Sequence, residues 1–286
     1  MELLFIPNTD TIPVSWGWFY FLLLLTFPLH LLSMNAMVGS LFIGIIQHIH
    51  GGNVQKKLAH RISIVLPLLV ATTVNFGVAP LLFLQVLYGQ FNYTSSVMMG
   101  SYWIIIIPLL ITAYYGTYLY DFKFKTLGRA GIIVALFSFL IFLVIASFFT
   151  NNMLLMILPE RFADYFDAMG GTIFLSDHPS YWPRLLHMVF GAMAVGSLFI
   201  GILGRFNSNN DKTLTEHSEK LGLKGFLIFT LINIILGVVY LISLPKDIIM
   251  LFMGQNGWAT LWFISGLFLT VGSLLCAMKK KLWLTV

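Results

Sequence analysis

Two histidines that begin nearly identical segments are the residues of this chain best suited to chemistry. His30 begins HLLSMNAMVGSLFIGI and His187 begins HMVFGAMAVGSLFIGI, so each precedes a glycine (Gly39 and Gly196) by nine residues and the last eight letters agree. An imidazole in an apolar segment needs a bonding partner, and it is a common axial ligand of haem iron. The repeat therefore indicates two equivalent haem-ligand candidates or two equivalent helix–helix hydrogen bonds.

The residues that share a helix face with each histidine are small or soft. At 4, 7, 11 and 14 residues beyond His187 they are Gly191, Ala194, Leu198 and Gly201, and beyond His30 they are Met34, Met37, Leu41 and Gly44. A flat macrocycle fits beside such a face. Close helix packing also requires small residues, so this pattern leaves both interpretations open.

Composition places both segments in a membrane. Of 286 residues, 58% are hydrophobic and 9% are charged, and the mean hydropathy is +0.89. Several apolar runs exceed the length that a membrane-spanning helix needs, and the alternating pattern of a membrane barrel is absent. We therefore predict an all-α, polytopic membrane bundle of about seven helices. The expected spans are Trp16–Gln47, Ile62–Gln90, Tyr102–Tyr120, Ala130–Thr150, Tyr181–Arg205, Leu223–Leu244 and Trp258–Met278.

The distribution of lysine and arginine predicts the orientation. Basic residues gather in the connections after the first, third and fifth spans and after the last one, where Lys279, Lys280 and Lys281 lie, whereas the connection at 151–181 is acidic. Basic loops mark the cytoplasmic side, so we expect the N-terminus outside and the C-terminus in the cytoplasm. The formal net charge of +5 is explained by these loops and does not indicate nucleic-acid binding. Cys276 is the only cysteine, which excludes a Cys-x-x-Cys-His haem attachment.

The repeated segments predict two parallel repeats of three helices within a single membrane domain, 1–286. Repeat one covers about 16–121, a linking helix and outer loop cover 122–180, and repeat two covers about 181–280. FGVAPLLF at Phe76 and LGVVYLIS at Leu236 are a weaker second match. Parallel repeats related by an axis along the membrane normal are a known membrane architecture.

Three motifs in this order resemble a known family. They are His30 with Gly39 nine residues on, NFGVAPLLFLQVLYGQ with Gly77 and Gly89, and the segment RLLHMVFGAMAVGSLFIGI that contains His187. Together they resemble subunit I of the prokaryotic cytochrome bd quinol oxidases over residues 16–245. The resemblance implies that His30 is an axial ligand at the oxygen-reducing end and that His187 is an axial ligand of a low-spin haem b.

The chain also departs from that family. The long quinol-binding loop is replaced by LPKDIIMLFMGQNG, where Met250 and Met253 are the nearest substitutes for the family's methionine ligand. No span contains Asp or Glu, and Gln85 replaces an acidic residue of the family's second helix. We therefore expect a shortened, bd-like subunit.

The resulting expectation is a haem b subunit of a respiratory oxidoreductase in a prokaryotic cytoplasmic membrane. It would carry one or two haems b near the outer face, with His30 and His187 as iron ligands and Met34, Gly39, Gly191 and Gly196 beside them. Its candidate partners are the lipid bilayer, another membrane subunit, a cytochrome c at the outer face, and quinol. The alternatives are a haem-free structural subunit of the same fold and a small membrane transporter.

Overall fold

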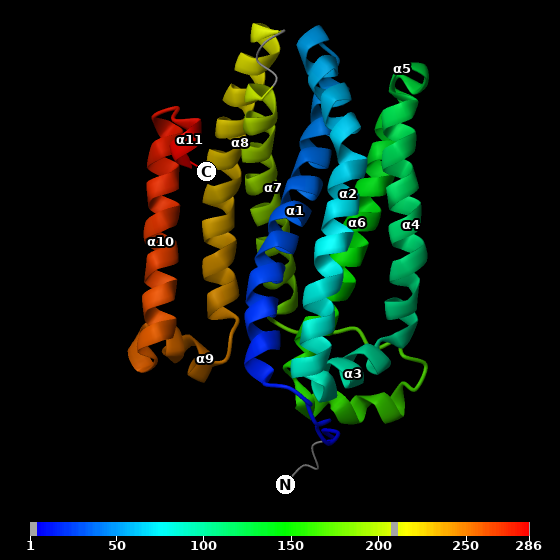
Figure 1. Cartoon of the computed structure of the whole chain (residues 1–286), viewed down its shortest axis with the longest axis vertical. Helices are drawn as coiled ribbons and strands as arrows, with labels where there is room; N and C mark the ends of the chain where they lie inside the picture. Colours follow the sequence, from blue (N-terminus) through cyan, green and yellow to red (C-terminus); the bar gives the residue numbers. More distant parts are fainter. Residues whose placement is uncertain (1–4, 207–210, 286) are drawn as a thin grey trace. The chain divides into compact units, whose positions relative to one another are not determined.

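The chain is an all-helical, multi-pass membrane protein. The computed structural model describes residues 5–206 and 211–285, and it contains no strand within those ranges. Seven of its helices are long and apolar enough to cross a membrane (Figure 1). The predicted fold class and the number of spans are therefore confirmed.

The seven long helices alternate with short elements. The long ones are α1 (Trp16–His50), α2 (Asn53–Leu87), α4 (Gly100–Phe122), α6 (Ala130–Met156), α7 (Tyr181–Arg205), α8 (Lys212–Ile242) and α10 (Gly257–Met278). The short ones are α3 (Gly89–Met98), α5 (Phe124–Leu127), the 3-10 helix η1 (Pro159–Asp167), α9 (Lys246–Met250), the π-helical turn η2 (Leu251–Gln255) and α11 (Leu282–Thr285).

Two long helices begin earlier than the apolar runs predict. α2 begins at Asn53 rather than Ile62, and α8 begins at Lys212 rather than Leu223. Their first turns are polar, and α8 is capped by Asp211, whose carboxylate accepts a hydrogen bond from the Leu214 amide at 3.1 Å. Hydropathy marks the part of a helix that suits lipid, whereas backbone hydrogen bonding continues as far as a cap allows.

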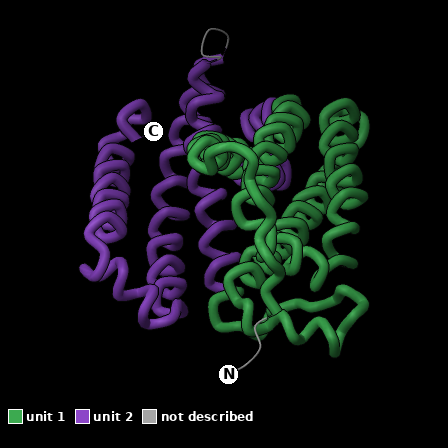
Figure 2. Tube along the Cα trace, turned by 60° about the horizontal axis from the view of Figure 1, so that its bottom comes forward, with its two compact units in different colours: residues 1–37, 63–181 green, residues 38–62, 182–286 purple. Residues whose placement is uncertain are grey.

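The chain divides into two compact units, shown in green and purple in Figure 2. The first comprises the residues up to 37 together with 63–181, and the second comprises 38–62 and the residues from 182 onward. In the first unit, α4 packs along α6. Asn151 of α6 is fully buried and fixes the connection that follows η1: its amide donates to the Ile173 carbonyl at 3.0 Å, and its oxygen accepts from the Leu175 amide at 2.8 Å.

In the second unit, the end of α1 packs directly on α7 through glycine. A Cβ atom on Gly39 would lie 2.8 Å from the Cα of Gly196, so the two backbones touch at this point. The two glycines occupy the same place in the repeated segment. Gly39 and Gly196 thus have a packing function in this unit.

Candidate functional site

His30 lies on α1 within the first unit, half-buried and bonded to α2. Its Nδ1 is 3.0 Å from the carbonyl oxygen of Thr73. A carbonyl oxygen can only accept, so Nδ1 carries the proton and donates it. Nε2 makes no hydrogen bond with any described residue and keeps its lone pair in the neutral ring.

A glycine one turn further along α2 makes room for this imidazole. A Cβ atom on Gly77 would lie 2.8 Å from both Cε1 and Nδ1 of His30. Thr73 and Gly77 are four residues apart, so the carbonyl that binds the histidine is the one that normally pairs with the Gly77 amide in an α-helix. A carbonyl has two lone pairs and can serve both donors.

Hydroxyl groups also join α1 to α2 beside His30. Ser33 Oγ lies 2.9 Å from Thr72 Oγ1 and 3.0 Å from Thr73 Oγ1. Thr72 Oγ1 also reaches the Leu68 carbonyl of its own helix at 3.0 Å. The hydroxyl groups that bond to one another beside His30 are uncharged.

His187 repeats the same arrangement in the second unit. Its Nδ1 lies 3.1 Å from the carbonyl oxygen of Asn233 on α8, and a Cβ atom on Gly237 would lie 2.9 Å from its Cε1. Asn233 and Gly237 are again four residues apart. Nε2 is once more without a hydrogen-bond partner in the described part of the chain. The geometry of each histidine is thus set by a helix carbonyl and by a glycine.

The two sites differ in what surrounds the imidazole. Tyr240, one turn beyond Gly237, stacks on His187 with ring centroids 6.3 Å apart and an interplanar angle of 27°. The phenol oxygen of Tyr240 accepts a hydrogen bond from Nε of Arg184 at 2.9 Å, and the Arg184 guanidinium carbon lies 5.6 Å from the Tyr240 ring centroid. The side-chain oxygen of Asn233 is buried without a hydrogen-bond partner in the described residues.

In the first repeat, the positions equivalent to Arg184 and Tyr240 are Phe27 and Pro80. Neither of these residues has a polar side chain. Among the described residues, the polar side chains recorded beside His187 therefore include a cation and a phenol, whereas those recorded beside His30 are the hydroxyls of Ser33, Thr72 and Thr73.

The other predicted site residues lie in several places. Gly191 leaves room for the Asn233 side chain, whose amide nitrogen would lie 3.2 Å from a Cβ atom there. Met34 is half-buried on α1, one turn beyond His30. Met250 ends α9, and Met253 lies in η2, which packs on α10 and leaves that side chain 49% exposed.

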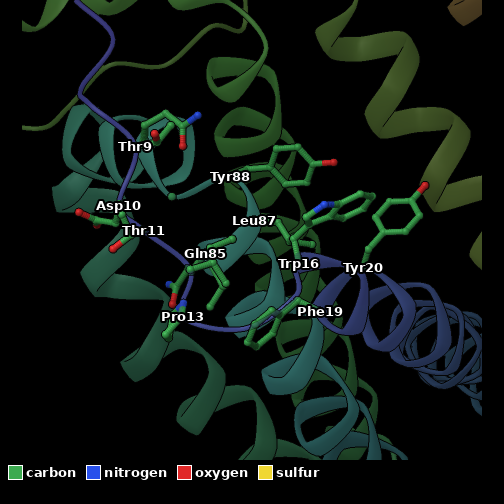
Figure 3. Close-up of a pocket in the computed structure, with 14 residues that line it drawn as sticks. Thr9, Asp10, Thr11, Pro13, Trp16, Phe19, Tyr20, Gln85, Leu87 and Tyr88 are labelled. Carbon is green, nitrogen blue, oxygen red and sulfur yellow. The ribbon is translucent and has the colours of Figure 1, made fainter.

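A separate cavity of about 930 Å³ lies in the first unit between the N-terminal segment, the start of α1 and the end of α2 (Figure 3). Figure 3 shows Trp16 and Tyr20 on α1, Gln85 on α2, and Asp10 in the N-terminal segment at its edges. Its wall is aromatic with a few polar groups, a composition typical of small-molecule sites. This cavity was not expected from the sequence.

The partners of the two histidines were also not predicted. Thr73 and Asn233 contribute backbone oxygens, which any residue type could supply. The available signal was the match between FGVAPLLF and LGVVYLIS, whose shared glycines are Gly77 and Gly237. Within the described residues there is no group of three or more His, Cys, Asp or Glu side chains that could hold a metal ion.

Comparison with known proteins gives no family for the chain. No protein-family model matches it, and no curated protein matches it. The interpretation of the two sites therefore depends on their residues and geometry.

Proposed function

We propose that this protein is a bd-like haem b subunit of a respiratory oxidoreductase, with His30 and His187 as axial ligands through Nε2. The observation that supports this most strongly is the repetition of one arrangement. Each imidazole donates Nδ1–H to a helix carbonyl and keeps Nε2 free for a metal. Metal-binding histidines commonly have such a second partner, because it fixes both the tautomer and the ring orientation.

His30 and His187 are both suitable axial ligands of haem iron. One nitrogen from the protein suffices as an axial ligand, and an imidazole held by a neutral carbonyl is a suitable donor. Because each unit contains its own histidine, bonded to a helix carbonyl and packed against a glycine, we assign one haem to each histidine. When bound, haem supplies one-electron chemistry, while the protein supplies ligation, orientation and burial.

The surroundings of such a protein are proposed from its charges and from the family that it resembles. The basic loops support an orientation with the N-terminus outside and the C-terminus in the cytoplasm. A prokaryotic cytoplasmic membrane is what the resemblance to the bd family implies. Electrons would pass near the outer face to or from a further membrane subunit or a cytochrome c, with oxygen as a candidate final acceptor.

Quinol is the candidate small-molecule donor, and the cavity between α1 and α2 supports it. Trp16 and Tyr20 provide aromatic surface for a ring, and the Gln85 amide provides a donor and an acceptor for its oxygens. We expect a short-chain quinone to quench tryptophan fluorescence in wild-type protein and to do so less in Trp16→Leu. Equal quenching in both proteins would place the quinone elsewhere.

A haem-free structural subunit is the second candidate, and the same contacts favour it. The hydrogen bonds from His30 to Thr73 and from His187 to Asn233 would hold helix pairs together without any cofactor. Under that alternative, the purified protein has no visible absorption in either oxidation state.

The experiment that separates the two candidates is a dithionite-reduced minus oxidised spectrum of the purified complex. We expect a b-type α band that His30→Ala and His187→Ala each reduce. His50→Ala is the matched control, because the His50 imidazole is exposed and, among the described residues, bonds to the Ile46 carbonyl of its own helix. Absence of a haem band in the wild type, with its partners retained, would favour the structural subunit.

A further inference from the structure

Arg184 is a cation in an unusual place. It lies in the first turn of α7, where the helix dipole already creates positive potential and a cation is disfavoured. It takes part in none of the ion pairs that the described residues form. A cation placed in this way, in a helix that is apolar enough to cross a membrane, calls for a negatively charged partner.

The contacts of Arg184 hold the side chain in place and leave most of its donors free. Only Nε is bonded, to the phenol oxygen of Tyr240, and the Tyr240 ring also stacks on His187. The Nη1 and Nη2 groups have no partner among the described residues, so four N–H donors are available to an anion. Paired N–H groups of a guanidinium match the two oxygens of a carboxylate.

The position of Arg184 relative to His187 indicates which anion it would bind. The two residues are three apart on α7, so their side chains lie on the same face of the helix. Haem carries two propionate carboxylates at its periphery, and His187 is the proposed iron ligand. On the basis of the proposed function, we propose that Arg184 pairs with a propionate of the haem bound by His187 and raises the reduction potential of that haem.

The two repeats differ in this positive charge. A nearby positive charge stabilises the reduced haem, which carries one unit of positive charge less than the oxidised haem. The position equivalent to Arg184 in the first repeat is Phe27, which carries no charge. We therefore expect the equivalent pairing to be missing at the haem bound by His30.

The test is a redox titration of the purified complex followed by optical spectroscopy, in a His30→Ala background so that only the His187 haem remains. We expect Arg184→Gln to shift the reduction equilibrium roughly tenfold towards the oxidised haem, which is about 59 mV for one electron. Arg184→Lys keeps the charge and should shift it less. Arg161→Gln removes the same charge from η1, where Arg161 pairs with Asp164, and should leave the potential unchanged.

The results for the Arg184 variants can be distinguished from the results that test the proposed function. If Arg184→Gln loses haem and Arg184→Lys keeps it, the requirement for charge is supported. A wild-type potential in Arg184→Gln, or loss of haem from both variants, would overturn the inference and leave Arg184 as a packing residue or a ligand of lipid phosphate. Absence of haem from wild-type protein would instead refute the proposed function itself.

Discussion

The contact between Gly237 and His187 predicts an unusual response to a single methyl group. A Cβ atom at position 237 would lie 2.9 Å from Cε1 and 3.3 Å from Nδ1 of the imidazole. Since carbon atoms in contact are roughly 3.5–4.0 Å apart, the ring or α8 must move by roughly 0.6–1.1 Å in Gly237→Ala. That movement is large enough to weaken the 3.1 Å bond from Nδ1 to the Asn233 carbonyl.

Several energetic terms of opposite sign contribute to the change in the free energy of unfolding of Gly237→Ala. Overpacking of this kind costs about 1–3 kcal/mol, and a lost hydrogen bond costs about 1 kcal/mol. Alanine offsets about 0.5–1 kcal/mol of this through its better helix propensity. We therefore expect Gly237→Ala to lower the free energy of unfolding by about 1–3 kcal/mol, although glycine-to-alanine changes inside helices usually stabilise.

The assay is denaturant unfolding of the detergent-solubilised protein, followed by circular dichroism. Gly266→Ala is the matched control, because Gly266 lies inside α10 and a Cβ atom there would meet no atom within 4 Å. The control should be neutral or stabilising. If Gly237→Ala is as stable as Gly266→Ala, the close contact between the imidazole and α8 is refuted.

Three further changes test other contacts by unfolding. Gly39→Leu inserts a side chain against the backbone of α7 at Gly196 and should destabilise by roughly 2–3 kcal/mol; wild-type stability would rule that contact out. Asn151→Ala leaves a buried carbonyl and a buried amide unpaired and should cost about 2–4 kcal/mol, unlike a change at an exposed asparagine. A hydrogen bond from the Lys57 ammonium lowers the pKa of the Asp211 carboxyl, so the stabilisation it gives is present above the unfolded-state pKa and is lost as the pH falls through the folded-state pKa. The unfolding temperatures of wild type and Asp211→Asn should therefore converge on acidification. A constant difference between them would contradict this.

Hydropathy predicted the long helices well and the short ones poorly. Seven spans follow from apolar runs because a lipid-facing helix must be apolar over its whole length. α3 was not predicted, because residues 91–101 are uncharged and have no marked periodicity, so they resembled a connection. The acidic connection at 151–181 also contains a short element, the 3-10 helix η1 from Pro159 to Asp167.

The sequence located the two histidines but not what holds them. Their identity as candidates followed from a repeated segment, which is visible in the letters alone. The acceptors at Thr73 and Asn233 are backbone atoms and leave no trace in residue type. The contact of Arg184 with Tyr240 joins α7 to α8 across 56 positions, and no local pattern predicts such a pairing.

The central claim is that each repeated histidine holds one haem b, and haem stoichiometry tests it most directly. The haem content of the purified complex would be measured as the pyridine haemochrome and divided by the amount of this chain, for wild type, His30→Ala, His187→Ala and the double variant. The account predicts about two haems per chain in the wild type, one in each single variant and none in the double variant. An unchanged haem content in the double variant would contradict it, because the haem would then be bound by other residues or by a partner subunit.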